Sequence, residues 1–140
     1  MHPLESDTGR GRRVLSEAIR AVRKRRRLKV GDVAQRMDLA RRSYEYFEAE
    51  GSLDLTRLQR FAEVTRSDAY AILLSIPLGS PQFAARCADN KMMTTFLTLA
   101  REFDLRLGDD IARLGTESIT RAFATAFRDL ESLARGDGKA

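Results

Sequence analysis

The residues best able to do chemistry are the arginines and lysines of residues 10–42. This window holds 13 basic and 3 acidic residues, a net charge of +10, whereas the whole chain of 140 residues has a net charge of only +5. Residues 67–140 hold 9 basic and 10 acidic residues, so the basic charge belongs to the first half. A field of this density suits a polyanion such as nucleic acid. The alternative is a solvated basic helix face with no partner.

Groups suited to catalysis are few. The chain has one histidine, His2, and one cysteine, Cys87. A histidine-based triad, a histidine-rich metal site and an intrachain disulfide therefore cannot be built from one chain. No glycine-rich phosphate loop occurs, and neither Ser43 nor Lys29 stands beside a general base. We expect a protein that is not an enzyme and that uses no metal and no cofactor.

The composition is typical of a soluble globular domain, with 43% hydrophobic and 32% charged residues. No run of eighteen apolar residues occurs, and the N-terminus lacks the apolar core of a signal peptide. A single cysteine suits a reducing compartment. We therefore expect a cytoplasmic protein, associated with the nucleoid and without membrane contact.

Apolar residues recur at three- and four-residue spacing along the whole chain, and no alternating β-branched run is present. This pattern predicts an all-α protein. Five short helices are expected over about residues 13–27, 30–37, 41–49 and 55–64 and from a cap at Ser67 to before Pro77. Met37 to Ala40 are predicted to form a tight turn in which Asp38 adopts the left-handed conformation.

The stretch IRAVRKRRRLKVGDVAQRMDLARRSYEYFEAEG, which ends at Gly51, resembles the helix-turn-helix of the bacterial Cro/C1-type family, also called the xenobiotic-response-element family. The matching features are a small alanine in the second helix, an apolar residue after the turn and a glutamate before a glycine loop. The residues that carry the resemblance are Leu28, Val33, Ala34, Met37, Leu39, Tyr44, Phe47, Glu48 and Gly51. It covers about residues 14–76 and implies a five-helix domain that binds double-stranded DNA.

The resemblance implies that the helix over about residues 41–49 reads the major groove of DNA. An α-helix fits that groove, and its N-terminal residues reach the base edges. Arg41 and Arg42 occupy this position, and an arginine can contact guanine O6 and N7 with two hydrogen bonds. The alternative is that both arginines contact only phosphates. The candidate base-reading residues are Arg41, Arg42, Tyr46, Ser43 and Glu45.

Phosphate contacts are expected from the basic residues around this helix. Lys29 stands beside Val30, where the family often has a polar residue that contacts a phosphate. Residues 1–13 are expected to form a basic arm along a phosphate strand or in a minor groove, or a mobile tail. The candidate phosphate-binding residues are Arg10, Arg12, Arg13, Lys24 and Lys29.

The resemblance also implies a structural ion pair. Arg23 on the first helix and Glu48 at the end of the third match a pair that ties these helices together in related domains. Ala40 stands where the family usually has a serine or threonine, so the start of the reading helix lacks a side-chain cap.

A cluster of proline, glycine and serine over residues 77–81 predicts a hinge. We expect a C-terminal helical region over residues 82–135, with long helices over about 91–107 and 116–134, and a tail over 136–140. Two apolar stripes on these helices favour a homodimer, with packing on the chain's own N-terminal domain as the alternative. The candidate interface residues are Met92, Phe96, Phe103, Phe123, Phe127 and Leu130.

The segment RCADNKMM follows the hinge, and Asp89, Asn90 and Lys91 within it are predicted to cap the long helix. Together with RRSYEYFEAE and SDAYAIL, it resembles alphaproteobacterial regulators of phage-like gene clusters, including gene transfer agents. That resemblance implies either repression, or activation through contact of the C-terminal helices with RNA polymerase or another regulator.

These observations together predict a sequence-specific DNA-binding transcriptional regulator. The alternative is a protein-interaction module, such as an antitoxin or anti-activator, that keeps the fold and reads little DNA.

Overall fold

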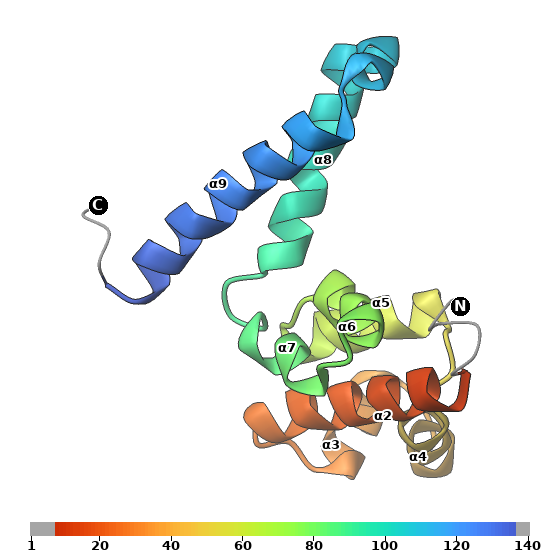
Figure 1. Cartoon of the computed structure of the whole chain (residues 1–140). Helices are drawn as coiled ribbons and strands as arrows, with labels where there is room; N and C mark the ends of the chain where they lie inside the picture. The colour runs from red at the N-terminus through yellow and green to blue at the C-terminus, as the bar shows by residue number, and fades with distance from the viewer. Residues whose placement is uncertain (1–7, 137–140) are drawn as a thin grey trace. The chain divides into compact units, whose positions relative to one another are not determined.

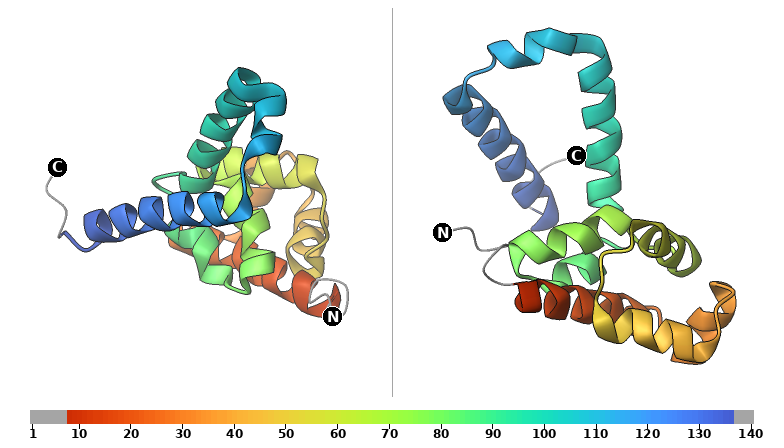
Figure 2. Two further views of the ribbon diagram at one scale, coloured as in Figure 1. Left: turned by 45° about the horizontal axis from the view of Figure 1, so that its top comes forward. Right: turned by 90° about the vertical axis from the view of Figure 1, so that its right-hand side faces the viewer.

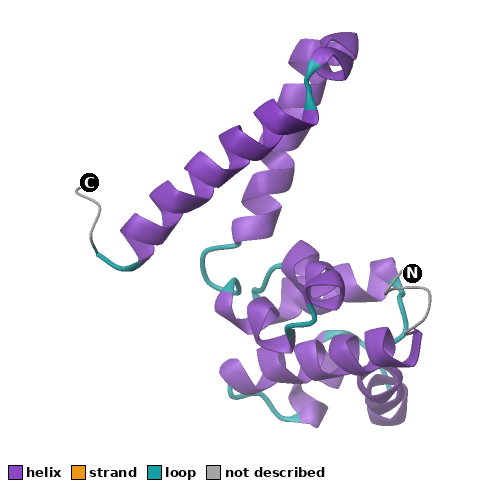
Figure 3. Ribbon diagram, viewed as in Figure 1, coloured by secondary structure: helices purple, strands orange, loops and turns teal. Residues whose placement is uncertain are grey.

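The computed structural model describes residues 8–136, which form helices and no strand, and it confirms the all-α class (Figure 3). The elements are α2 (Thr8–Arg25), α3 (Val30–Arg36), α4 (Arg41–Glu50), α5 (Leu55–Thr65), α6 (Ala69–Leu78), α7 (Pro81–Arg86), α8 (Met92–Leu107), the 3₁₀ helix η1 (Gly108–Arg113) and α9 (Thr116–Ala134). His2, residues 1–7 of the predicted arm and residues 137–140 of the predicted tail lie outside the described residues.

The chain divides into two units, residues 1–98 and residues 99–140. In the first unit, α2 packs against α4, α6 and α7 (Figure 1). Apolar side chains at three- and four-residue spacing place one face of α2 in the core. The largest fully buried side chains include Leu15, Ile19, Val22, Val33, Tyr44, Phe47, Leu58, Phe61 and Ile72.

The connections on either side of α4 depend on left-handed residues. Asp38 has φ 58°, as predicted, and Leu39 donates its backbone N–H to the carbonyl of Ala34 at 2.9 Å, which closes the turn between α3 and α4. Gly51 follows α4 with φ 58°. A Cβ at Gly51 would overlap the carbonyl oxygen of Arg12, so this position requires glycine for both conformation and space.

The N-terminal part of α2 differs from the prediction. Residues 8–13 were expected in an arm, but they form the first turns of the helix, so Arg10, Arg12 and Arg13 are helical. Contacts with the rest of the unit favour this extension. A Cβ added at Gly11 would lie 3.5 Å from Ile76, so the helix packs closely there. The backbone carbonyl of Arg12 lies against Gly51. Tertiary packing therefore outweighs the low helix propensity of glycine.

The predicted hinge also differs. Pro77 lies inside α6, where it cannot donate a backbone N–H to the carbonyl of Leu73, and the helix ends shortly after it at Gly79, which has φ 62°. The connection to α7 is short, and α7 packs on α2. Ala84 and Ala88 are fully buried because their small side chains allow close approach. Residues 81–98 therefore belong to the first unit, and the boundary falls after Thr98.

Asp68 begins α6, in place of the predicted cap Ser67. It is fully buried, and its Oδ1 accepts the backbone N–H of Ala71 at 3.2 Å. The same carboxylate reaches the start of α8, where Oδ2 accepts the N–H of Met93 at 2.8 Å and Oδ1 accepts the hydroxyl of Thr94 at 2.7 Å. Of the residues predicted to cap α8, Asn90 accepts the N–H of the helix's first residue at 2.9 Å.

The second unit contains the end of α8, η1 and α9. None of the residues in these elements is buried. Of the predicted interface residues, Met92 is half-buried, and the exposed ones are Phe96, Phe103, Phe123, Phe127 and Leu130. Over the described residues, no helix is both long enough and apolar enough to cross a membrane.

Candidate nucleic-acid interface

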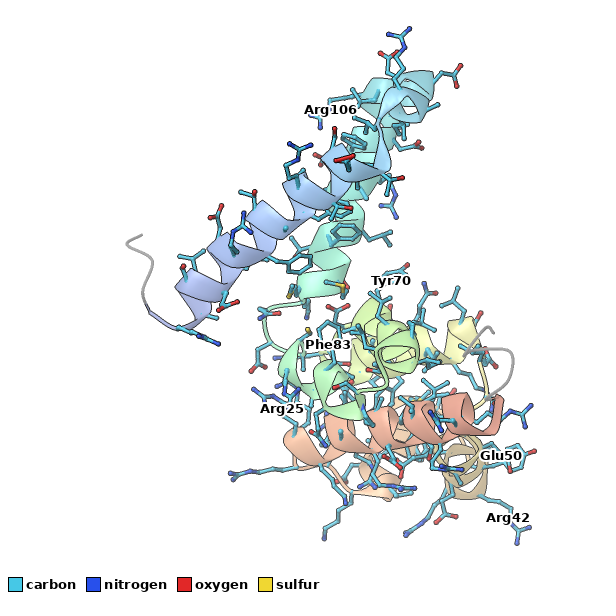
Figure 4. All side chains as sticks on the ribbon, in the orientation of Figure 1. Arg25, Arg42, Glu50, Tyr70, Phe83 and Arg106 are labelled. Atoms are coloured by element: carbon cyan, nitrogen blue, oxygen red, sulfur yellow. The ribbon has the colours of Figure 1, made fainter. Side chains whose placement is uncertain are left out.

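The helix α4 has a buried side and an exposed side. Tyr44, Phe47 and Glu48 are buried and form the inner side of the helix. The predicted base-reading residues lie on the other side, with Ser43 half-buried at its border and Arg41, Arg42, Glu45 and Tyr46 exposed. Figure 4 shows Arg42 pointing away from the body of the first unit. These side chains are therefore accessible to a ligand.

The starts of α3 and α4 lie close together. A Cβ at Gly31, in the first turn of α3, would lie 4.0 Å from Nη1 of Arg41. Lys29, which immediately precedes α3, is exposed, and its backbone N–H is held by Oδ2 of Asp32 at 2.9 Å. The structure therefore brings Lys29 and Arg41 to the same end of the helix pair.

The N-terminus of α4 carries no side-chain cap. Ala40 occupies the cap position, and its methyl side chain has no atom that could accept a hydrogen bond. The N–H groups of the first turn have no partner inside a helix, and the helix dipole is positive at this end. Together with Arg41 and Arg42, they form a surface suited to an anion.

Arg41 forms only a weak ion pair. Its Nε lies 3.4 Å from Oε2 of Glu45, and both side chains are more than half exposed. A surface pair of this kind contributes about 0.2–1 kcal/mol, so a ligand can replace it readily.

Glu48 fixes the orientation of α4 through a buried cluster of hydrogen bonds. Its carboxylate accepts Nε and Nη2 of Arg23 at 2.7 and 3.0 Å, and the hydroxyl of Tyr44 at 2.6 Å. Arg20 adds a longer contact at 3.3 Å, and Nη1 of Arg23 donates to the carbonyl of Leu28 at 3.1 Å. The predicted ion pair is therefore present. The contributions of Arg20 and Tyr44 were not predicted.

The pKa values of this cluster follow from its hydrogen bonds. The hydrogen bond to Glu48 raises the pKa of Arg23. Burial acts to raise the pKa of Glu48, but hydrogen bonds from Arg23 and Tyr44 outweigh it and bring that pKa below its ordinary value of 4.5. Burial, followed by the hydrogen bond to Glu48, raises the pKa of Tyr44. Glu48 and Arg23 are therefore charged and Tyr44 is neutral at physiological pH.

The predicted phosphate-binding residues occupy both ends of α2. Arg10, Arg12 and Arg13 are exposed on its first turns, where Arg12 lies beside the end of α4. Lys24 is exposed in the last turn of α2, and Lys29 is exposed at the start of α3. Of these residues, Lys29 directly precedes α3, whose first turn lies beside Arg41 at the start of α4.

Two arginines of the basic run have structural roles that the sequence did not reveal. Arg26 donates Nε to the carbonyl of Thr65 at 2.8 Å and Nη2 to that of Arg66 at 2.7 Å, which satisfies the end of α5. Asp89 contacts Nη1 of Arg26 at 2.7 Å and Nη2 of Arg25 at 3.1 Å. The hydrogen bond from Arg26 lowers the pKa of Asp89. Part of the basic charge therefore stabilises the first unit.

No cluster of three or more histidine, cysteine, aspartate or glutamate side chains among residues 8–136 has the arrangement to hold a metal ion. Cys87 is buried, and this burial raises the pKa of its thiol.

No family model matches the chain, and no curated protein or solved structure matches it significantly. The relation to Cro/C1-type regulators stays a prediction from the residues quoted above.

Proposed function

We propose that the protein is a sequence-specific transcriptional regulator that binds double-stranded DNA in the cytoplasm, at the nucleoid. The observation that carries this proposal is that α4 has one buried side and one exposed side. Its buried side is held by Glu48, while Arg41, Arg42 and Tyr46 are exposed on the other side. A helix that is fixed on one side and carries arginines at its exposed N-terminal end suits insertion into the major groove.

The proposed contacts follow from the side chains on the exposed surface. Arg41 and Arg42 hydrogen-bond guanine O6 and N7, and each bidentate contact contributes about 1–3 kcal/mol of discrimination. Tyr46, which is 64% exposed, lies one turn further along and contacts a base edge or a thymine methyl group. Glu45, once separated from Arg41, can accept a hydrogen bond from a cytosine amino group.

Phosphate contacts position α4 without reading sequence. Lys29 is suited to this role because it lies at the end of α3 nearest the start of α4. Lys24 and the arginines at the start of α2 contribute to the general attraction. Each phosphate that is neutralised releases counterions, so affinity falls as salt concentration rises.

Selection of bound duplexes from a random library tests the proposal, with genome-wide mapping of bound sites in the source cell as the second step. We expect one shared motif containing guanines. Binding that shows no enriched motif and is lost at physiological salt would instead support the alternative, a protein-interaction module such as an antitoxin or anti-activator.

The class of target genes comes from the sequence resemblance to regulators of phage-like gene clusters and gene transfer agents. We propose such a cluster as the regulated locus. A reporter joined to its promoter, measured with and without the protein, distinguishes activation from repression. Unchanged reporter output, together with a bound motif elsewhere in the genome, would reject this cluster as the regulated locus. The DNA-binding proposal would still stand.

A further inference from the structure

The second unit has no hydrophobic core of its own. Its described part, residues 99–136, is 38 residues long and contains no buried residue. Isolated units below about 40 residues seldom bury enough surface to be stable without a disulfide, a metal or oligomerisation. Cys87 lies outside the unit, and the described part of the chain offers no metal cluster. A surface outside the second unit is therefore required to cover these helices.

The exposed apolar side chains lie on one stripe of each helix. On α8, Leu99 and Phe103 are four residues apart; on α9, Phe123, Phe127 and Leu130 follow at four- and three-residue spacing. Figure 2 shows η1 joining α8 to α9, and no residue of either helix is buried, so the two stripes do not cover each other. The apolar face of the second unit is Leu99, Phe103, Phe123, Phe127, Leu130 and Leu133, and these side chains are between 37% and 58% exposed.

We propose that the apolar face of the second unit is covered by the same face of a second copy of the chain. The two copies then contribute two helices each, α8 and α9, to one four-helix core related by a twofold axis. This inference goes beyond DNA binding and does not depend on it.

Charge favours a second copy over a strongly charged partner. Residues 99–136 contain 6 basic and 7 acidic residues, a net charge of −1. Two copies of a nearly neutral unit do not repel each other, whereas a strongly basic or acidic partner would find no complementary field there.

The exposed area is also of the size that a dimer needs. An aromatic side chain presents about 150–250 Å², so a half-exposed one leaves about 100 Å² to be covered. With Phe96 at 52% exposure on the same stripe of α8, four half-exposed phenylalanines offer on the order of 400 Å² of apolar surface per chain, and Leu99, Leu130 and Leu133 add to it. A standard protein interface buries about 800 Å² on each partner.

The test is the molar mass of the full chain in solution without DNA, measured by light scattering over a dilution series in the micromolar range. We expect twice the chain mass of 15.8 kDa. Phe127→Asp places a charge in the apolar face and is expected to give a monomer. Thr125→Asp is the matched control, because Thr125 is exposed on the opposite side of α9, and it should stay dimeric.

Phe127→Asp could also unfold α9, so Phe127→Ala and Leu130→Ala are measured beside it. Both keep helix propensity, and each should raise the dimer dissociation constant at least tenfold while circular dichroism at high concentration stays unchanged. A monomeric wild-type chain would overturn the proposal and point to the chain's own first unit, RNA polymerase or another regulator as the occupant. A dimer that tolerates all three substitutions would overturn it as well, because another surface would then form the interface.

Discussion

The carboxylate of Asp68 and the hydroxyl of Thr94 form a hydrogen bond of 2.7 Å, which joins the start of α6 to the first turn of α8. Asp68 also accepts backbone N–H groups from both helices. One buried carboxylate therefore caps two helices whose starts lie more than twenty residues apart in sequence. Removal of this side chain exposes unpaired donors at two helix ends in a single step.

We expect Asp68→Ala to lower the free energy of unfolding by about 2–4 kcal/mol, because loss of one cap costs about 1 kcal/mol and unpaired buried donors cost more. Urea denaturation followed by circular dichroism measures the loss. Asp54→Ala is the control, because Asp54 caps α5 alone through the N–H of Arg57 at 3.1 Å. Equal losses for the two variants would contradict the double role of Asp68.

We expect Glu48→Gln to lower the free energy of unfolding by about 3–5 kcal/mol, since it leaves Arg23 without its buried partner. Chemical denaturation at neutral pH measures this. The exposed Glu45→Gln should change stability by less than about 1 kcal/mol, because Glu45 forms only a surface pair with Arg41. A loss below about 1 kcal/mol for Glu48→Gln would show that the cluster does not hold α4.

The contribution of Glu48 to the free energy of unfolding is expected to depend on pH. The pKa of Glu48 is lower in the folded chain than its ordinary value of 4.5. The stability that its charge contributes is therefore present above about pH 4.5 and is lost as the pH falls through the lower, folded-state pKa. We expect the stability difference between wild type and Glu48→Gln to shrink on acidification. Denaturant midpoints at several pH values measure it, and a difference that grows would refute this assignment.

We expect Arg41→Ala and Arg42→Ala each to reduce discrimination between a selected duplex and a random duplex by about 5- to 150-fold, the equivalent of one bidentate contact. Lys24→Ala should weaken binding to both duplexes alike and make the slope of affinity against salt shallower by about one. Fluorescence anisotropy at two salt concentrations separates these effects. If all three variants lost affinity equally on both duplexes, the arginines would contact phosphates only.

Two glycines allow the effects of conformation and space to be separated. Gly51 and Gly79 both have positive φ, but only at Gly51 would a Cβ overlap the backbone, at Arg12. We expect Gly79→Ala to lower stability by about 1–2 kcal/mol through strain alone. Gly51→Ala should lower it by about 1–3 kcal/mol more, because α2 and α4 must move apart. Thermal unfolding of both variants measures the difference, and similar losses would mean that the helices adjust freely.

The sequence predicted those features that local patterns control. The helices and the left-handed Asp38 follow from apolar spacing and turn chemistry. The contacts of Asp89 with Arg26, 63 residues away, leave no local signal, because nothing near either residue marks its partner. Pro77 led to the prediction of a hinge, but it lies inside α6. The packing of α7 on α2 keeps the residues after it in the first unit.

Contacts between α2 and α4 occur at two places, where Arg23 holds Glu48 and where Arg12 lies against Gly51. Neither rotation of α4 about its own axis nor sliding along α2 is then compatible with both contacts. The backbone of α4 is consequently ordered before any ligand arrives. Association would restrict mainly the rotamers of a few exposed side chains, each at about 0.5–1.5 kcal/mol, which favours fast and selective binding by a nearly rigid surface.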